Sequence, residues 1–381
     1  MFRRSLPRLL APAPGVPGAS QANTANATPQ AAGFGNITDQ MLPSSSALFR
    51  PIPAPRTVAV IPAPMTYGQP FMGTDKGPDL LLDAGINSSL TQLGWRVSSE
   101  PEVNPAIEDD GRSTPLAAKN SVRVGLGCKA LAKVTHRAAR GGMFPLTLGG
   151  DHSVALGSLA GVLRARPGTG VIWVDAHADL NTPWISDSGN MHGMPVGLLM
   201  EGMVPEGAGL LDVPGLEWLD KTWAGEEGWP KYTPEDPPPR LSPQDIVYVG
   251  LRDVDQKERD AIKKLGIRTF TMYDIDKHGV GAVMEKAVRH LLSKDLNRPI
   301  HLSYDIDAVD PAQAPATGTA VRGGLTYREA HFIAESVCAS GQLGSADIVE
   351  LNPTLSDQEG ADQTTELGFQ LVTSFMGKSI I

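Results

Sequence analysis

Cysteine is nearly absent from this sequence. Only Cys128 and Cys338 occur among 381 residues, and they lie far apart in the chain. Small secreted proteins use many disulfides to stabilise a small core, whereas two distant cysteines in a chain of this length indicate reduced thiols. The sequence therefore predicts an intracellular protein.

Long apolar runs are also absent. No stretch approaches the ~18 uninterrupted apolar residues that a membrane-spanning helix needs, so we predict no membrane partner. Hydrophobic residues still make up 41% of the chain and charged residues 20%. This composition is typical of a soluble globular protein with a sizeable core. We find no internal repeat.

Positive charge is outnumbered by negative charge outside the first fifty residues. The net charge is −9, although residues 1–50 carry four arginines against Asp39 alone. An acidic body argues against a nucleic-acid partner. It favours metal cations and a cationic small substrate, and solubility explains it equally well.

Residues 1–54 are rich in Ala, Pro, Ser, Asn and Gly, and we predict a disordered N-terminal extension. Its Arg-bearing, acid-poor start is similar to a mitochondrial transit peptide. Prolines at positions 7, 12 and 14 interrupt the amphipathic helix of such signals, so a plain disordered tail is the alternative. The predicted location is cytoplasmic or mitochondrial.

Residues 55–381 form the predicted catalytic domain, in which short apolar runs alternate with helical stretches. Strands are expected at 57–61, 95–99, 144–148, 171–174, 245–250, 267–271, 299–304 and 346–351. Helices are expected at 78–93, 118–140, 153–164, 255–265, 279–294, 326–340 and 361–376. This alternation predicts an α/β fold with a parallel sheet, either open or closed into a barrel. A surface insertion at about 201–243 holds Trp218, Trp223 and Trp229.

The run 171–182 turns from apolar to polar at Asp175, His177 and Asp179. In an extended segment these three side chains share one face, which predicts a divalent cation site. Carboxylate oxygens mixed with imidazole suit Mn²⁺. A strand end that merely becomes polar at the solvent is the alternative.

Two further strand ends carry the same chemistry. Gly149 and Gly150 permit a tight turn that presents His152, and Ser153 is expected to cap the next helix. Asp305 and Asp307 follow another apolar strand with no basic residue before Arg322. Like charges this close favour a bound cation. Together the three strand ends provide four carboxylates and two imidazoles, which suit two metals that share a bridging water and present hydroxide as nucleophile.

Six motifs resemble those of the arginase/agmatinase ureohydrolase family. They are G-G-D-H-S at 149–153, D-A-H-A-D-L-N-T at 175–182, S-G-N-M-H-G-M-P-V at 188–196, G-L-R-D-V-D at 250–255, S-Y-D-I-D-A-V-D-P at 303–311 and P-A-T-G-T at 315–319. Within the family, S-G-N-M-H-G, G-L-R-D-V-D and E-L-N-P at 350–353 resemble the arginases rather than the agmatinases, and the long insertion at 201–243 makes the chain similar to arginases of fungal type. The resemblance implies a three-layer α/β/α sandwich around an eight-stranded parallel sheet. It also implies hydrolysis of L-arginine to L-ornithine and urea, and a homotrimer or homohexamer.

The resemblance further implies two Mn²⁺ per subunit and a role for each motif residue. The implied metal ligands are His152, Asp175, His177, Asp179, Asp305 and Asp307. Asp179 would pass a proton to the leaving amino group, His192 would act as proton shuttle, and Glu350 would fix the guanidinium. The remaining implied substrate-binding residues are Asn181, Ser188 and Asn190 for the α-carboxylate, Asp255 and Glu258 for the α-ammonium, and Thr319.

Three alternatives to an arginase stay open. An agmatinase-like enzyme would share the metals and act on another guanidino compound. A catalytically silent scaffold of the same fold usually lacks some ligands, whereas all six are present here. A two-metal phosphatase would need a phosphate-binding glycine-rich loop or an arginine cluster, and the sequence has neither near the site.

Overall fold

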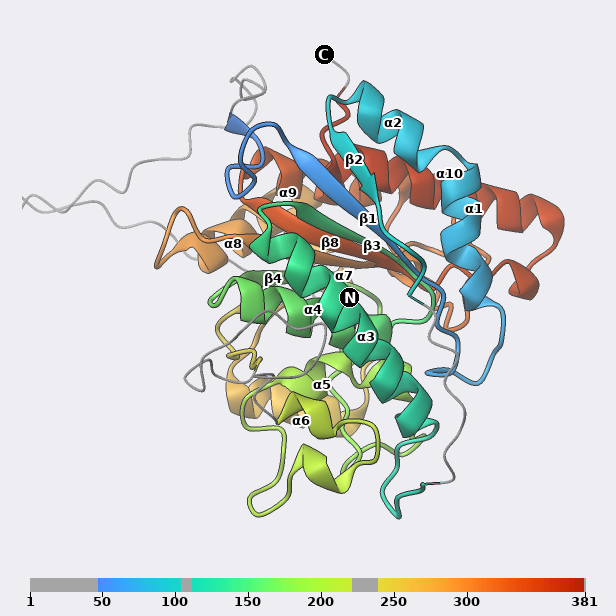
Figure 1. Cartoon of the computed structure of the whole chain (residues 1–381), viewed down its shortest axis with the longest axis vertical. Coiled ribbons are helices and arrows are strands. Elements are labelled where there is room, and N and C mark those ends of the chain that lie inside the picture. Colours follow the sequence, from blue (N-terminus) through green and yellow to red (C-terminus); the bar gives the residue numbers. More distant parts are fainter. Residues whose placement is uncertain (1–46, 104–111, 221–238, 380–381) are drawn as a thin grey trace, which may run out of the picture. The chain divides into compact units, whose positions relative to one another are not determined.

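One parallel sheet organises the protein, as Figure 1 shows. The computed structural model describes residues 47–103, 112–220 and 239–379, all within one unit, Leu42–Ile381. The strand order is β2-β1-β3-β8-β7-β4-β5-β6, and neighbouring strands pair in parallel. The strands are β1 (Thr57–Ala63), β2 (Arg96–Ser99), β3 (Phe144–Gly149), β4 (Gly170–Val174), β5 (Ile246–Leu251), β6 (Arg268–Thr271), β7 (Ile300–Asp305) and β8 (Leu343–Val349).

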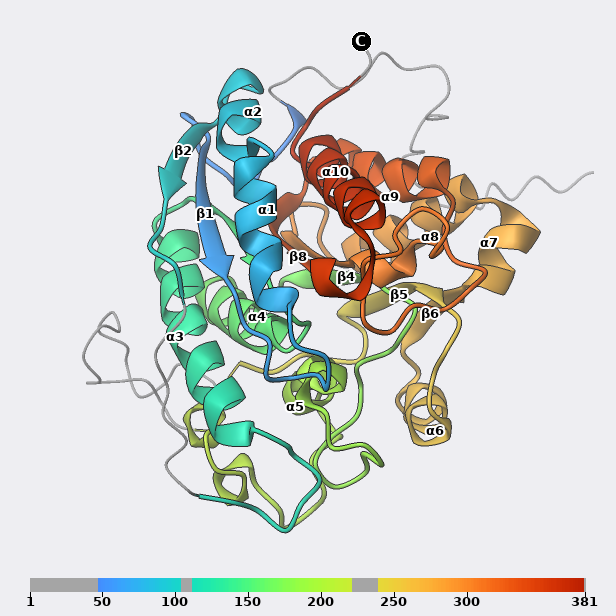
Figure 2. The ribbon, with the colours of Figure 1, turned by 90° about the vertical axis from the view of Figure 1, so that its right-hand side faces the viewer.

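Helices cover both faces of the sheet (Figure 2). The helices are α1 (Gly77–Asp83), α2 (Ile86–Gln92), α3 (Ser121–Arg140), α4 (Val154–Ala165), α5 (Pro195–Leu199), α6 (Gln256–Leu265), α7 (Met272–His278), α8 (Val280–Leu292), α9 (Tyr327–Ala339) and α10 (Gln358–Phe375). One apolar cluster joins the sheet to α1, α2 and α8–α10, and the other joins it to α3, α4 and α5. The predicted three-layer sandwich is therefore confirmed, and the barrel is excluded.

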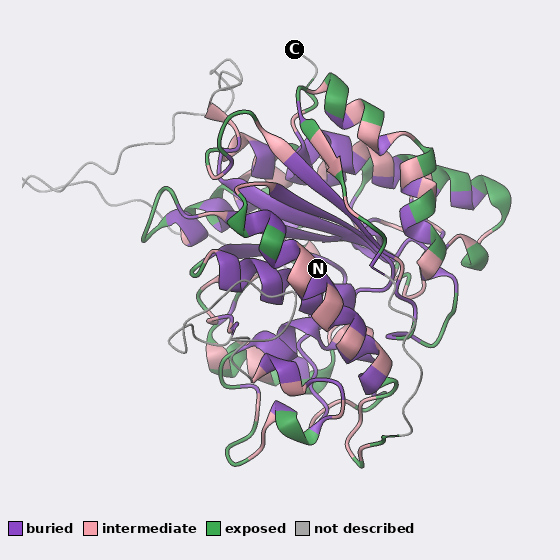
Figure 3. Cartoon of the chain, in the orientation of Figure 1, coloured by how far each residue is buried: buried purple, intermediate pink, exposed green. Residues whose placement is uncertain are grey.

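Alternation along each strand supplies both apolar clusters. Ile172 and Val174 of β4 pack on one face of the sheet, whereas Val171 and Trp173 pack on the other. Successive side chains of a strand point to opposite faces, so a strand covered on both sides must be apolar throughout. This is why the central strands are buried along their whole length (Figure 3).

Several element boundaries differ from those predicted, and two of the differences follow from left-handed backbone conformations. The expected helix 78–93 is two helices, because Gly85 has a φ of 96° and separates α1 from α2. The last strand ends at Val349 instead of residue 351. Glu350 has a φ of 68°, a left-handed conformation that a strand cannot continue.

The described fold begins before the predicted boundary at residue 54. Phe49 is 1% exposed, and its ring centroid lies 4.7 Å from that of Trp95 and 6.0 Å from that of Phe144. An apolar side chain in a core stabilises the fold through the area that it removes from water. Residues 47–54 therefore belong to the fold, while most of the predicted N-terminal extension lies outside the described residues.

The predicted insertion is ordered where the structure describes it. Trp218 is 3% exposed, and its indole N–H donates a 2.9 Å hydrogen bond to the Gly125 carbonyl on α3. Trp223 and Trp229 lie outside the described residues. Within the described ranges, no helix combines the length and the apolar character needed to cross a membrane.

Glycines let helix α4 pack closely against α3. A Cβ at Gly157 would lie 2.5 Å from the Cys128 carbonyl oxygen, and one at Gly161 would lie 2.5 Å from that of Ala132. Such contacts are shorter than any side chain tolerates, so these positions require glycine. Helix α4 begins two residues after His152. The distance at which α4 packs against α3 therefore determines where that histidine lies.

Candidate metal centre

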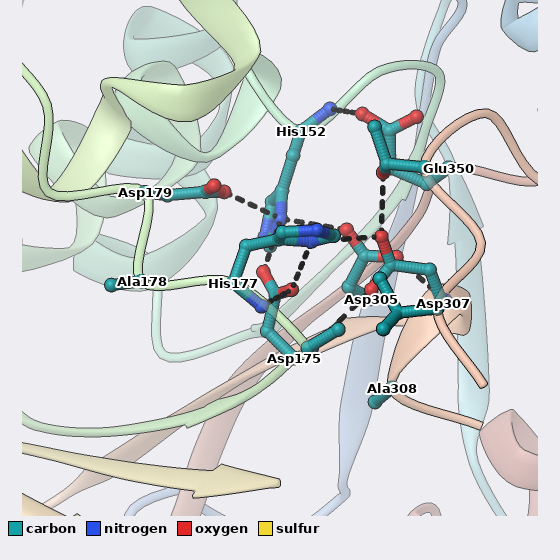
Figure 4. Close-up of polar contacts among 12 residues, drawn as sticks. His152, Asp175, His177, Ala178, Asp179, Asp305, Asp307, Ala308 and Glu350 are labelled. Atoms are coloured by element: carbon teal, nitrogen blue, oxygen red, sulfur yellow. Dashed lines mark hydrogen bonds and ion pairs between the residues drawn. The ribbon is translucent and has the colours of Figure 1, made fainter. Parts of the chain in front are cut away.

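The six predicted metal ligands come together at the carboxyl ends of β3, β4 and β7, as Figure 4 shows. The three strands run in the same direction, so these ends lie at one edge of the sheet. Asp175, His177 and Asp179 were predicted to share one face of an extended strand. This prediction was wrong, because β4 ends at Val174 and the three residues lie in the following loop. The loop turns at Asp179, whose φ is 48°, and it still directs the side chains to one centre.

The first cluster surrounds the His152 imidazole. Its Nδ1 lies 3.1 Å from Asp175 Oδ2, 3.0 Å from Asp179 Oδ2 and 3.0 Å from Asp305 Oδ2. His152, Asp175 and Asp305 are almost completely buried. Three carboxylate oxygens thus converge on one nitrogen that can carry a single proton.

The second cluster contains His177 and uses the other oxygen of Asp175. His177 Nδ1 lies 3.3 Å from Asp175 Oδ1 and 3.1 Å from Asp307 Oδ2. The ligand atoms of each set, His152–Asp175–Asp305 and Asp175–His177–Asp307, lie within 4.8 Å of one another. Asp175 therefore belongs to both clusters.

Unpartnered polar atoms show that the first cluster fits a cation. Among the described residues, His152 Nδ1 and Asp179 Oδ2 are buried and have no aligned hydrogen-bond partner. The two atoms lie 3.0 Å from each other in poor hydrogen-bond geometry, and a cation bound between them would satisfy both. Oxygen and imidazole donors together suit a divalent ion of intermediate hardness.

Burial and neighbouring charges shift the pKa values of the predicted metal ligands. Burial raises the pKa of the Asp179 carboxyl to about 6, with a further contribution from the negative charge of Asp175. Burial alone would lower the pKa of His177, but Asp307 and Asp175 raise it well above its usual range. The pKa of His152 is raised in the same way against the effect of its burial, by Asp175, Asp179 and Asp305.

A polar pocket of about 150 Å³ lies against both clusters. His177, Asp179 and Asp305 form part of its wall. Seven predicted substrate or catalytic residues also line it: Asn181, Ser188, Asn190, His192, Asp255, Glu258 and Thr319. The structure thus brings together residues that are up to 142 positions apart in the sequence, from His177 to Thr319.

The comparison with known proteins agrees with this arrangement. The model of the arginase family matches residues 56–377. The chain belongs to the arginase family. The arginase of Glaciozyma antarctica is 38% identical over 90% of this chain and 93% of its own, and that of Neurospora crassa is 42% identical over 86% and 87%. The crystal structure of Entamoeba histolytica arginase in complex with L-ornithine superposes with a TM-score of 0.68 at 29% identity, covering 85% of this chain and 99% of that one. The predicted family and its fungal relatives are confirmed.

Glu258 and Thr319, which the arginase resemblance assigns to substrate binding, are hydrogen-bonded within the protein. Both carboxylate oxygens of Glu258 accept backbone N–H groups, from Leu180 at 2.8 Å and from Asp255 at 3.1 Å. The Thr319 hydroxyl donates a 2.7 Å hydrogen bond to Asp307 Oδ2. These contacts orient the loops that carry the predicted metal ligands and Asp255.

Glu350 lies beside the pocket and is 1% exposed. Its Oε1 accepts a 2.7 Å hydrogen bond from the His152 backbone N–H and lies 3.3 Å from His192 Nδ1. Burial alone would lower the pKa of His192, but the contact with Glu350 and the charges of Asp179 and Asp151 raise it to about 9. The pKa of His192 is therefore set by the carboxylates around it.

Sequence reasoning missed several residues that hold the site. Gln69 donates a 2.8 Å hydrogen bond to Glu350 Oε2, and Ser303 Oγ lies 2.9 Å from His152 Nε2. The Trp173 ring stacks on His152 with centroids 4.2 Å apart, and its N–H donates to Asp175 Oδ2. Trp173 and Ser303 each lie two positions before a ligand, so strand alternation could have indicated them. Nothing in the sequence near Gln69 points to Glu350.

Tyr248 contacts the loop that carries His177 and Asp179, two of the predicted metal ligands. Its buried hydroxyl donates a 2.7 Å hydrogen bond to the Ala178 carbonyl, between His177 and Asp179. We expect Tyr248→Phe to lower the free energy of unfolding by about 1–2 kcal/mol, because the carbonyl loses a buried partner. Metal affinity should fall several-fold, as measured by titration calorimetry.

Tyr304→Phe is the matched control for this experiment. Its buried hydroxyl donates a longer 3.3 Å hydrogen bond to the Ala330 carbonyl, on a helix that carries no ligand. This variant should be slightly destabilised and keep its metal affinity. Equal metal affinities for the two variants would contradict a supporting role for Tyr248.

Proposed function

We propose that the protein hydrolyses L-arginine to L-ornithine and urea, using two Mn²⁺ ions per subunit. The observation that carries this proposal is the pair of ligand clusters that share Asp175 and contribute His177, Asp179 and Asp305 to the wall of a pocket that Asp255 also lines. Membership of the arginase family supports the same reaction.

Six side chains would hold the two ions. His152, Asp179 and Asp305 would bind one ion, His177 and Asp307 would bind the other, and Asp175 would bind both. Two bound divalent cations supply a water molecule of lowered pKa, which acts as a nucleophile at neutral pH.

Asp179 and His192 are proposed to move the protons of the reaction. Both side chains line the pocket in which the substrate would bind, so each is placed to exchange a proton with the reacting groups. His192 contacts Glu350 within the protein, and its exposed fraction of 15% lets it exchange protons with water. We propose that Asp179 delivers a proton to the leaving amino group and that His192 removes one from the nucleophile.

Substrate binding is proposed to follow the charges of arginine. A planar guanidinium pairs well with a carboxylate, the role that we assign to Glu350. Asn181, Ser188 and Asn190 provide neutral polar groups for the α-carboxylate, and Asp255 provides a negative charge for the α-ammonium. The Asn181 amide donates a 3.1 Å hydrogen bond to Asp255 Oδ2, so the two recognition elements lie side by side.

The direct test is urea release by Mn²⁺-loaded protein, with L-arginine and agmatine as separate substrates and metal-stripped protein as control. We expect urea from arginine, loss of activity on chelation and recovery on adding Mn²⁺. Urea from agmatine alone would replace the proposed substrate with a decarboxylated one. No urea from either would refute the proposed reaction.

Proton release on metal binding is a second expected result. The raised pKa values of His152 and His177 keep both rings protonated at neutral pH, and each ring must lose a proton before Nδ1 can bind a cation. Metal affinity should therefore rise with pH. Calorimetric titrations in buffers of different ionisation enthalpy would measure a net release of protons on metal binding, as expected when protonated imidazoles become ligands. Binding without proton release would contradict imidazole ligation.

We also propose a homotrimer or homohexamer in the cytoplasm or the mitochondria, as the arginase resemblance implies. Light scattering of the purified chain would measure the assembly, and a monomer would contradict it. Imaging of the full-length chain beside a variant without residues 1–46 would test whether the extension directs the protein to mitochondria.

A further inference from the structure

Arg252 binds backbone carbonyls on the loop that follows β7. Its guanidinium donates hydrogen bonds of 2.6 Å to the Asp307 carbonyl and 2.9 Å to the Ala308 carbonyl. Two further bonds, of 3.1 and 2.8 Å, reach the Val321 carbonyl. A planar guanidinium with five N–H donors can satisfy several carbonyls in one plane, which a lysine ammonium cannot.

The backbone of Arg252 binds the other ligand-bearing loop. Its N–H donates a 2.9 Å hydrogen bond to the Ala176 carbonyl, between Asp175 and His177, and the N–H of Asp253 donates to the same oxygen at 3.0 Å. The Ala176 N–H in turn donates to Asp307 Oδ1 at 3.3 Å. One residue therefore contacts both loops that carry the second cluster.

A bulge in β5 brings Arg252 to this position. The pairing of β5 with β6 shifts register between Val249 and Leu251, and Gly250 between them has a φ of 99°. A Cβ at Gly250 would lie 3.3 Å from the Asp175 carbonyl oxygen. Bulges redirect the strand that contains them, and here the backbone approaches the Asp175 loop closely.

The first cluster is held by other residues. His152 follows β3 and contacts Trp173, Ser303 and Glu350. Arg252 makes no hydrogen bond to any of these residues in the described structure. The two clusters thus have separate supports, although they share Asp175.

We propose that Arg252 is a positioning residue that fixes the distance between the β4 and β7 loops, and so maintains the Asp175–His177–Asp307 cluster selectively. This inference rests on the proposed pair of divalent cations. It assigns to the G-L-R-D-V-D segment a function in metal retention as well as the proposed recognition of the α-ammonium by Asp255.

The test counts the Mn²⁺ retained per chain after dialysis against a series of free Mn²⁺ concentrations. Wild-type protein should retain two ions. Arg252→Lys keeps the charge and loses most of the hydrogen bonds, so one ion should bind 10–100-fold more weakly, the usual effect of losing a residue that supports metal ligands. Arg252→Met removes the charge as well and should weaken the same ion further. If Arg252→Met fails to fold, Arg252→Lys alone provides the result.

Arg298→Lys is the matched control. Arg298 also binds two carbonyls, those of Gly168 at 2.5 Å and Leu291 at 3.2 Å, and pairs with Asp245 at 2.6 Å. It lies just before β7 begins, at the opposite end of the strand from Asp305. This variant should lose thermal stability and still retain two ions with wild-type affinity.

A second pair of variants identifies which of the two ions is bound more weakly when Arg252 is replaced. In a His177→Asn background, which leaves the His152 cluster intact, adding Arg252→Lys should change the affinity of the remaining ion less than threefold. In a His152→Asn background, the same change should weaken the remaining ion by the full 10–100-fold.

Equal weakening of both ions, or of neither, in Arg252→Lys would overturn the inference and leave the proposed function standing. Wild-type protein that retains fewer than two ions would instead refute the metal content of the proposed function, and this inference with it.

Discussion

Replacement of Asp175 by Asn is expected to abolish urea release and metal retention together. Its Oδ2 faces His152 and its Oδ1 faces His177, so one amide removes negative charge from both clusters and directs an NH₂ group at one of them. Loss of the activated nucleophile should lower kcat by at least about 10³-fold. Initial rates with L-arginine and metal counts by mass spectrometry would measure both effects.

Asp347→Asn is the control for this experiment, because it replaces a buried carboxylate that lies outside both clusters. Asp347 is also completely buried and lies 3.1 Å from a histidine, His301, but belongs to neither cluster. We expect this variant to be less stable and to retain both ions. If Asp175→Asn kept two ions per chain at wild-type affinity, the assignment of Asp175 as a shared ligand would be wrong.

Replacement of Asp255 by Asn is expected to raise the KM for L-arginine about 10–100-fold, with a smaller change in kcat. A hydrogen bond between two charged groups contributes about 1.5–3 kcal/mol, which corresponds to this range. Asp255 is close enough to Asn181 to share the recognition of one amino-acid head group. Steady-state kinetics over a range of arginine concentrations would separate KM from kcat.

Agmatine as a competing ligand sharpens this test, because it keeps the ammonium of arginine and lacks only the α-carboxylate. Asp255→Asn should therefore weaken the binding of agmatine and of arginine alike. Ser188→Ala, on the proposed carboxylate side of the pocket, should weaken arginine and leave the inhibition constant of agmatine unchanged. An unchanged KM for arginine in Asp255→Asn would remove Asp255 from substrate recognition.

The sheet could be predicted because a strand that is buried on both faces has an uninterrupted run of apolar residues in the sequence. Val171 to Val174 are apolar without exception, and such a run has few structures other than a central strand. The strand order could not be predicted in this way, since it depends on helix packing that no local pattern encodes. The end of β8 was misplaced for a related reason, because the left-handed conformation of Glu350 follows from its contacts with His152, Gln69 and His192.

The gathering of these aspartates and histidines could be predicted because like charges this close are costly without a cation. Their geometry could not, because Asp175, His177 and Asp179 lie in a loop and not along a strand. Ser153 illustrates a second limit. It was expected to cap α4, but its hydroxyl donates to the neighbouring Asp151, whose other oxygen accepts the Gly68 N–H at 2.7 Å. A short polar side chain near a helix start can satisfy either partner, and only the folded chain determines which.

The close approach of α4 to α3 makes the geometry of the site depend on residues in the protein core that do not line the pocket. A methyl group added at Gly157 or Gly161 would meet the α3 backbone and push the start of α4 away from the sheet. His152 would move with it, and its distances to three carboxylates, now 3.0–3.1 Å, would change. Mutational libraries built only from residues that line the pocket would omit these two positions. A substitution there could still inactivate an enzyme whose pocket residues are all intact.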